Sequence, residues 1–252
     1  MKRKLSLGTH HFSIASIKAL TEKLFSANVL SAQLLYLCVV ADIVFIGLHI
    51  LYEFIPVIDD PALKITLDRG YAEVFQYVKM FWIASILSVV AFRSRSLLYW
   101  VWVGFFSYLL LDDSLRIHEN WSKADYFPSL FGIHPHASGE LIISGSIGVI
   151  FLSLIAATYR SGDRLAKSVS QVLVMMLILL GILGVLIDAF NSMVEVGIFN
   201  PLLATLEDGG EMIVISFILA FVFCLPQRLQ SARKRWGRTH DTERMKIISN
   251  RY

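Results

Sequence analysis

A short polar stretch at the end of an apolar run carries the residues best suited to chemistry. Residues 109–119 read LLLDDSLRIHE, in which three leucines precede a set of ionisable side chains: Asp112, Asp113, Arg116, His118 and Glu119. Carboxylates and imidazoles can hold a divalent metal ion, and they can also accept and release protons near neutral pH. The stretch is therefore a candidate centre for metal binding or proton transfer.

Carboxylates in the second half of the chain could complete such a site. The predicted metal ligands are Asp112, His118, Glu119, Asp188, Glu195, Glu207 and Glu211. Among them, Glu119, Asp188 and Glu211 are the candidates for catalysis. Further polar residues are expected in the same chamber, namely Asp42, His49, Glu73, Arg116, His134, His136 and Glu140.

Known motifs narrow the chemistry only partly. Carboxylates and histidines on facing helices are typical of di-iron and di-manganese bundles, but the paired Glu-x-x-His motifs of those proteins are absent. Zinc-protease, dinucleotide-binding, phosphate-loop and nucleophile-elbow motifs are absent as well. We therefore expect a divalent metal ion without assigning its identity. If the protein is an enzyme, we expect a metal-dependent hydrolase or oxidoreductase that acts on a lipid or on a small molecule at the outer face.

Some of these residues also have simpler structural explanations. The helix dipole favours a negative charge at the amino-terminal end of a helix, which is the expected position of Glu73, Glu140, Glu207 and Asp208. His118 could be an ordinary hydrogen-bonded residue at a membrane interface. The Gly209–Gly210 pair could serve only to let two helices approach closely, or it could also bring Glu207 and Glu211 against the neighbouring helices.

Other acids need a partner of opposite charge. Asp112 could pair with Arg116, which lies one turn later in the same predicted helix. Asp188 and Glu195 have no basic neighbour in their own segment. Their partner should therefore be Arg116 or Lys79 from another helix, a proton, or a metal ion.

The composition predicts the framework that must position these residues. The 252 residues are 56% hydrophobic and only 17% charged, with a mean hydropathy of +0.62. A membrane crossing needs about 20 mostly apolar helical residues. Six such segments are expected, which makes the fold an all-α, polytopic membrane bundle: residues 30–54, 71–92, 96–117, 140–159, 168–190 and 206–225.

Basic residues predict the orientation of this bundle. Lysines and arginines gather in both tails and in the loops around residues 93–95 and 160–167. Because basic loops tend to stay in the cytoplasm, both termini should be cytoplasmic and the acidic helix ends should face outward. The expected organisation is a tail of residues 1–28 with an interfacial amphipathic helix over 13–25, a six-helix domain of residues 29–225, and a basic tail of residues 226–252.

The expected location is a cell membrane of the bacterial inner-membrane type, without a signal peptide. Membrane lipid is the expected partner, with anionic lipid at the basic tails, and nucleic-acid binding is not expected. Cys38 and Cys224 fall in separate predicted spans, so we interpret them as packing residues. The oligomeric state stays open.

Two other functions remain open beside the metal site. Inward-facing acids such as Asp42, Asp112, Asp188 and Glu211 could carry protons or cations through a transporter or channel. The cytoplasmic half has few polar residues and no internal repeat is evident, which argues against a continuous path. A scaffold or sensor with a stabilising cation at its acidic end would need no catalysis.

Overall fold

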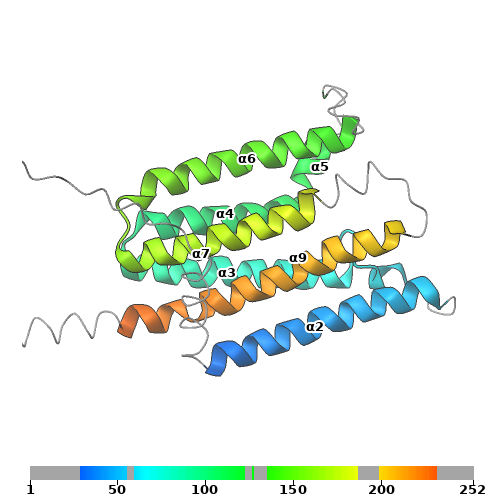
Figure 1. Ribbon diagram of the computed structural model, residues 1–252, viewed down its shortest axis with the longest axis horizontal. Coiled ribbons are helices and arrows are strands. Elements are labelled where there is room, and N and C mark those ends of the chain that lie inside the picture. The colour runs from blue at the N-terminus through cyan, green and yellow to red at the C-terminus, as the bar shows by residue number, and fades with distance from the viewer. Residues whose placement is uncertain (1–28, 56–59, 123–126, 128–134, 187–198, 232–252) are drawn as a thin grey trace, which may run out of the picture.

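A computed structural model describes the protein over residues 29–55, 60–122, 127, 135–186 and 199–231. Over these residues the chain is all-helical and contains no strand. Long helices lie side by side and alternate in direction along one axis (Figure 1). They are α2 (Val29–Phe54), α3 (Tyr71–Ser94), α4 (Leu97–Leu115), α6 (Pro135–Tyr159), α7 (Arg164–Gly181) and α9 (Phe199–Phe223). Three short elements extend or connect them, namely the 3-10 helix η1 (Pro61–Leu63), α5 (Ile117–Ser122) and the π-helix η2 (Ile182–Leu186).

Five of the long helices are long and apolar enough to cross a membrane, namely α2, α3, α6, α7 and α9. Helix α4 corresponds to the third predicted span, but it is not one of the five. It has 19 residues, so any stretch of 18 residues within it contains both Asp112 and Asp113. These two carboxylates lower the hydropathy of a helix that is otherwise apolar.

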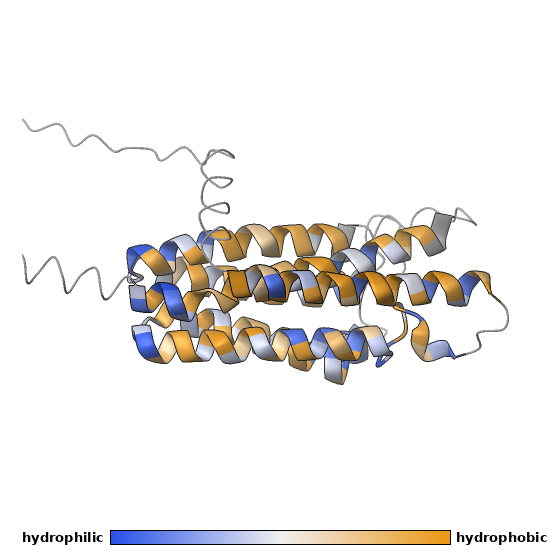
Figure 2. Cartoon of the chain, turned by 90° about the horizontal axis from the view of Figure 1, so that it is seen from below, coloured by the Kyte–Doolittle hydropathy of each residue, from blue (hydrophilic) through white to orange (hydrophobic). Residues whose placement is uncertain are grey.

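Helix α9 lies inside the bundle, whereas α2 and α6 lie at its edge. In the most apolar stretch of α9, 67% of the residues are buried, against 17% in α2 and 6% in α6. The edge helices expose large apolar side chains such as Leu37, Val44, Val149 and Leu154. Figure 2 shows apolar residues along most of each helix and hydrophilic residues gathered toward the ends. Surfaces of this kind suit contact with lipid and suggest a membrane protein.

A cluster of aromatic residues fastens α4 to its neighbours. Trp102 is fully buried and its ring packs against Phe105 and Phe106 of the same helix. Its indole Nε1–H donates to Ser170 Oγ of α7 at 3.0 Å. The buried indole therefore has a hydrogen-bond partner, as a polar group in an apolar interior requires.

An ion pair is buried among three helices. Lys79 of α3 and Asp42 of α2 are both fully buried, and Lys79 Nζ lies 2.8 Å from Asp42 Oδ1. The ammonium group also donates to the Met212 carbonyl at 2.8 Å and to Ser216 Oγ at 3.1 Å. Ser216 in turn donates to Asp42 Oδ2 at 2.5 Å. The network joins α2, α3 and α9, and it satisfies all three ammonium protons.

Two helix boundaries differ from the predicted segments in ways that matter for the acids. Helix α9 begins at Phe199, seven residues before the predicted start at 206. Glu207 and Asp208 therefore lie inside the helix, and their interpretation as amino-terminal caps was wrong. Helix α6 begins at Pro135, which places Glu140 beyond its first turn.

The amino-terminal position of Glu73 agrees with the prediction. Helix α3 begins at Tyr71 after the N-cap Gly70, so Glu73 lies in the first turn. Its carboxylate accepts the backbone N–H of Arg69, which precedes the helix. For this residue, the structural explanation accounts for the charge.

The start of α2 and the helical segment that follows α9 lie toward the same end of the bundle (Figure 1). The turn at Arg93 and Arg95 and the turn before Arg164 also lie at this end. The predicted amphipathic segment 13–25 and the basic tail beyond residue 231 are outside the described residues. At the opposite end lie the carboxyl end of α4 and the short helix α5.

Candidate functional site

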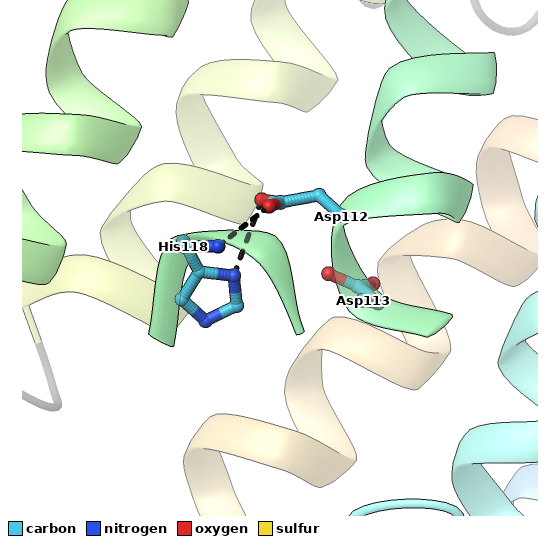
Figure 3. A group of neighbouring side chains, drawn as sticks. All are labelled: Asp112, Asp113 and His118. Carbon is cyan, nitrogen blue, oxygen red and sulfur yellow. Dashed lines mark hydrogen bonds and ion pairs between the residues drawn. The ribbon is translucent and has the colours of Figure 1, made fainter. Parts of the chain in front are cut away.

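Asp112, Asp113 and His118 form a compact group at the junction of α4 and α5 (Figure 3). Each offers one atom that could bind a metal ion, and these atoms all lie within 4.8 Å of one another. Asp112 is buried, and the other two residues are partly buried. Two carboxylates and one imidazole at this separation can serve as ligands of a divalent cation.

The local backbone explains how residues six positions apart come together. Arg116 ends α4 in the left-handed conformation, with φ of 55°, and α5 begins at the next residue. This reversal brings the start of α5 back toward the last turn of α4. Asp112 Oδ1 then accepts the backbone N–H of His118 at 2.9 Å, so the carboxylate also satisfies a donor at the start of α5.

The imidazole of His118 faces the same carboxylate. His118 Nδ1 lies 3.2 Å from Asp112 Oδ2, an ion-pair distance, although the ring N–H is not well directed for a hydrogen bond. The Asp112 carboxylate raises the pKa of His118 above its ordinary value, and burial of the ring opposes this effect. The proximity of the two side chains is what makes the group a candidate ligand set.

Arg116 does not neutralise Asp112 in the way that the spacing suggested. Its left-handed backbone takes it out of α4, and its Nη2 lies 2.5 Å from Asp68 Oδ2 in the segment before α3. The i, i+4 pairing rule holds only while both residues stay in one helix. The ion pair with Asp68 instead connects the α4–α5 turn to the loop that precedes α3.

A cavity of about 610 Å³ adjoins the cluster. Its walls come from α3, α4, α6, α7 and α9, and most of the lining side chains are apolar. One part of the wall is polar and includes the three residues of the cluster together with Gln76, Tyr108, Glu140, Glu207 and Glu211. Glu207 and Glu211 of α9 thus line the same cavity as the acids of α4.

A second, smaller cavity of about 190 Å³ lies beside the segment 65–68. Four residues line both cavities: Gln76, Asp113, His118 and Glu211. Gln76 is only 9% exposed, and its Oε1 has no hydrogen-bond partner among the described residues. A buried amide oxygen without a donor is unusual. It could accept a hydrogen bond from a ligand or bind a cation.

One glycine leaves room for the Glu211 carboxylate, and two others allow close packing of α9 against its neighbours. A Cβ at Gly184, in the π-helix η2, would overlap the Glu211 carboxylate. Gly209 would place a Cβ 3.0 Å from Ile46 of α2, and Gly210 would place one 3.1 Å from Leu183 of η2. The Gly209–Gly210 pair therefore does allow close helix packing, and Gly184 leaves the room that the carboxylate occupies. π-Helical turns of this kind often occur at functional sites.

Other predicted site residues lie elsewhere or cannot be placed. His49 is buried in α2 and lines neither cavity. Asp42 belongs to the buried ion pair with Lys79. Five predicted residues fall outside the side chains that the structure describes: Glu119, His134, His136, Asp188 and Glu195.

Two residues of the site were not among the predicted ligands. Asp113 was named among the ionisable residues of the 109–119 stretch, but it was left out of the ligand set. Gln76 is neutral, so a search for charged residues within the predicted membrane helices does not find it. Its spacing from Glu73 and Lys79, three residues in each direction, does place it on the same face of α3 as two polar residues.

The chain belongs to a family described as Domain of unknown function (DUF8692), whose match covers residues 34–225. This range includes the cluster at the end of α4 and the residues of α9 that face it. No curated protein and no solved structure matches the chain significantly.

Proposed function

We propose that this DUF8692 protein is a multi-pass membrane protein that binds a divalent metal ion at Asp112, Asp113 and His118 and uses it in an enzymatic reaction. The observation that carries the proposal is the convergence of their three ligand atoms within 4.8 Å, beside a cavity large enough for a substrate. Cavities of about 300 to 1,000 Å³ are typical of small-molecule sites. Glu211 and Gln76 supply further oxygen atoms at the same wall.

The membrane arrangement that we propose has six crossings, with α4 as the sixth. Helix α4 runs antiparallel to α3 and α6 and is embedded in the same bundle as the five apolar helices (Figure 1). The basic turns at residues 93–95 and 160–167 lie at the end opposite to the cluster, whereas Arg116 at the cluster end pairs with Asp68. We therefore place that end, both termini and the basic tails in the cytoplasm against anionic lipid, and the cluster at the outer face of a cell membrane.

A divalent ion bound at the cluster would polarise a carbonyl or phosphoryl oxygen or lower the pKa of water. The protein's own contribution is to hold the ligands and to position an acid or base. Glu211 is the candidate for that role, because it lines both cavities together with Asp113 and His118. The reaction class that this arrangement suits is metal-dependent hydrolysis of a lipid or of a small molecule at the outer face.

The alternative of proton or cation transport draws less support. It requires Asp42 to take part in a path with Asp112 and Glu211. Asp42 is instead held by Lys79 and Ser216, and it lines neither of the two cavities. A scaffold or sensor would use the same metal site without turnover, so metal binding is the property to test first.

The test is metal analysis of the purified full-length protein after equilibration with Zn²⁺, Mn²⁺ or Fe²⁺ and removal of the excess. We expect about one ion per chain in the wild type and a loss of binding in Asp112→Asn and in His118→Gln. Asp60→Asn is the matched control, because this acid lies in an outer loop and lines neither cavity. A wild-type protein that retains none of these ions would rule out the proposal.

A further inference from the structure

We propose that the cavity of about 610 Å³ binds one hydrocarbon chain of a membrane lipid, whose polar group lies at the Asp112–Asp113–His118 cluster. This inference deepens the proposed function by naming a substrate class, and its polar end rests on that function. The lining is apolar away from the cluster, with Phe105 and Leu109 of α4 and Leu152 of α6 among its residues. Apolar side chains of this kind form no hydrogen bonds with a polar molecule, but they pack well against a hydrocarbon chain.

The extent of the cavity matches the depth of one membrane leaflet. On α6, its lining runs from Glu140 to Leu152, which corresponds to about 18 Å of helix at roughly 1.5 Å per residue. The hydrocarbon core of a bilayer is about 30 Å thick, so one leaflet contributes about 15 Å. A chain that begins beside the cluster can therefore extend along the cavity toward the middle of the membrane.

Glycines leave the middle of this cavity open. Gly148 of α6 and Gly181 of α7 both line it, and a Cβ at either position would meet no atom within 4 Å. The two helices are joined at the turn before Arg164 and run side by side from it (Figure 1), and residues of both line the cavity. Helix α6 is also the least buried of the apolar helices. The space between α6 and α7 thus borders the lipid from which a chain would enter.

The polar end offers partners for a lipid head group. Gln76 Oε1 is buried, lines the cavity and has no hydrogen-bond partner among the described residues, and the Tyr108 hydroxyl, which lies near Asp112, lines the same cavity. Gln76 can accept a hydrogen bond and Tyr108 can donate one or accept one. A head-group hydroxyl would donate to Gln76 Oε1, a hydroxyl or ester oxygen would accept from Tyr108, and a metal ion at the cluster would bind a further oxygen. A purely apolar ligand would leave Gln76 Oε1 without a donor.

The test uses a palmitic acid with a photoreactive diazirine in its chain, added to the full-length protein in lipid nanodiscs. We expect light to attach the probe to lining residues of α6 and α7, identified by peptide mass spectrometry. Gly148→Leu and Gly181→Leu fill the cavity and should reduce this labelling several-fold. Gly145→Leu is the matched control, because Gly145 lies on the same helix and also has open space around it, but it does not line either cavity.

Labelling that stays unchanged in Gly148→Leu and Gly181→Leu would overturn the proposal. An equal loss in Gly145→Leu would overturn it as well, since labelling would then depend on the outer surface of α6. A chelator separates this inference from the metal site. If the two variants block labelling while chelation has no effect and the protein holds no metal, the chain site stands and the metal function fails. If metal binds at the cluster but the amount of attached probe is the same in both variants as in the wild type, the metal function stands and the lipid site fails.

Discussion

Replacement of Lys79 by methionine should destabilise the whole bundle. Lys79→Met removes the cation and leaves the carboxylate of Asp42 buried, with Ser216 Oγ as its hydrogen-bond donor. Both charged groups are fully buried, so solvent cannot replace the missing partner. Breaking a buried ion pair by removing one side costs about 3–5 kcal/mol. For a chain of this size, roughly 2–4 °C of Tm per kcal/mol gives a predicted loss of about 6–20 °C.

The two cysteines provide the assay. Cys38 and Cys224 are the only cysteines of the chain, and both are buried and free. A thiol-reactive dye therefore reports unfolding directly as the detergent-solubilised protein is heated. Cys38 lies one turn before Asp42 in α2. The dye thus also detects local opening of α2 beside the ion pair.

The double variant Asp42→Leu with Lys79→Met is the decisive comparison. It removes both charges and fills their space with apolar side chains, which is often neutral or stabilising for a buried pair. We expect it to recover most of the Tm lost in the single variant. A double variant that melts as low as Lys79→Met would refute the reasoning, and so would a single variant within about 2 °C of the wild type.

Three further variants test other contacts. Gly184→Ala should displace the Glu211 carboxylate and lower the free energy of unfolding by about 1–3 kcal/mol, whereas Gly181→Ala meets open space and should be neutral or slightly stabilising. If the dye-monitored Tm is the same in the two variants, the overlap at Gly184 is contradicted. Ser170→Ala removes the acceptor of the Trp102 indole and should lower the free energy of unfolding by about 0.6–1.7 kcal/mol, measured as a lower Tm. Ser153→Ala is the exposed control, and an equal loss of Tm in both variants would show that the Trp102 hydrogen bond does not contribute to stability. Asp68→Asn breaks the partly exposed ion pair with Arg116 and should lower the free energy of unfolding by less than about 1 kcal/mol, with no change in the metal content of the protein. A loss of bound metal would mean that the ligand positions at the α4–α5 turn depend on this ion pair.

Hydropathy and helix periodicity were sufficient to predict the framework. The apolar runs located the long helices of the described residues, five of which are long and apolar enough to cross a membrane. The helix ends were harder to predict, since they depend on single residues. Arg116 ends α4 in a left-handed conformation that an arginine rarely adopts, and no sequence pattern predicted this conformation. That one residue moved the end of the helix and changed the partner of Asp112.

The pairing of charges between helices could not be read from spacing alone. Lys79 was considered a possible partner for acids of the fifth predicted span, and it pairs with Asp42 of α2 instead. Which acid faces a given lysine depends on how each helix is rotated about its axis, and a rotation of one residue position turns a side chain by about 100°. The role of Gln76 could not be predicted for the same reason, because its amide group is available to a ligand only if α3 is rotated so that this side chain lines the cavity.

The buried network around Lys79 also has a consequence for how the chain enters a membrane. A single charge at the centre of a crossing helix costs about 2.5–3.5 kcal/mol on insertion scales. Because α2 precedes α3, Asp42 is already present when Lys79 is inserted, and the two charges can enter as a neutral helical hairpin. The Met212 carbonyl and Ser216 arrive only with α9, the last long helix described. We therefore expect the ion pair to form before its remaining hydrogen bonds. In a ribosome-bound chain that ends before α9, Lys79 should still lack the acceptors that Met212 and Ser216 provide.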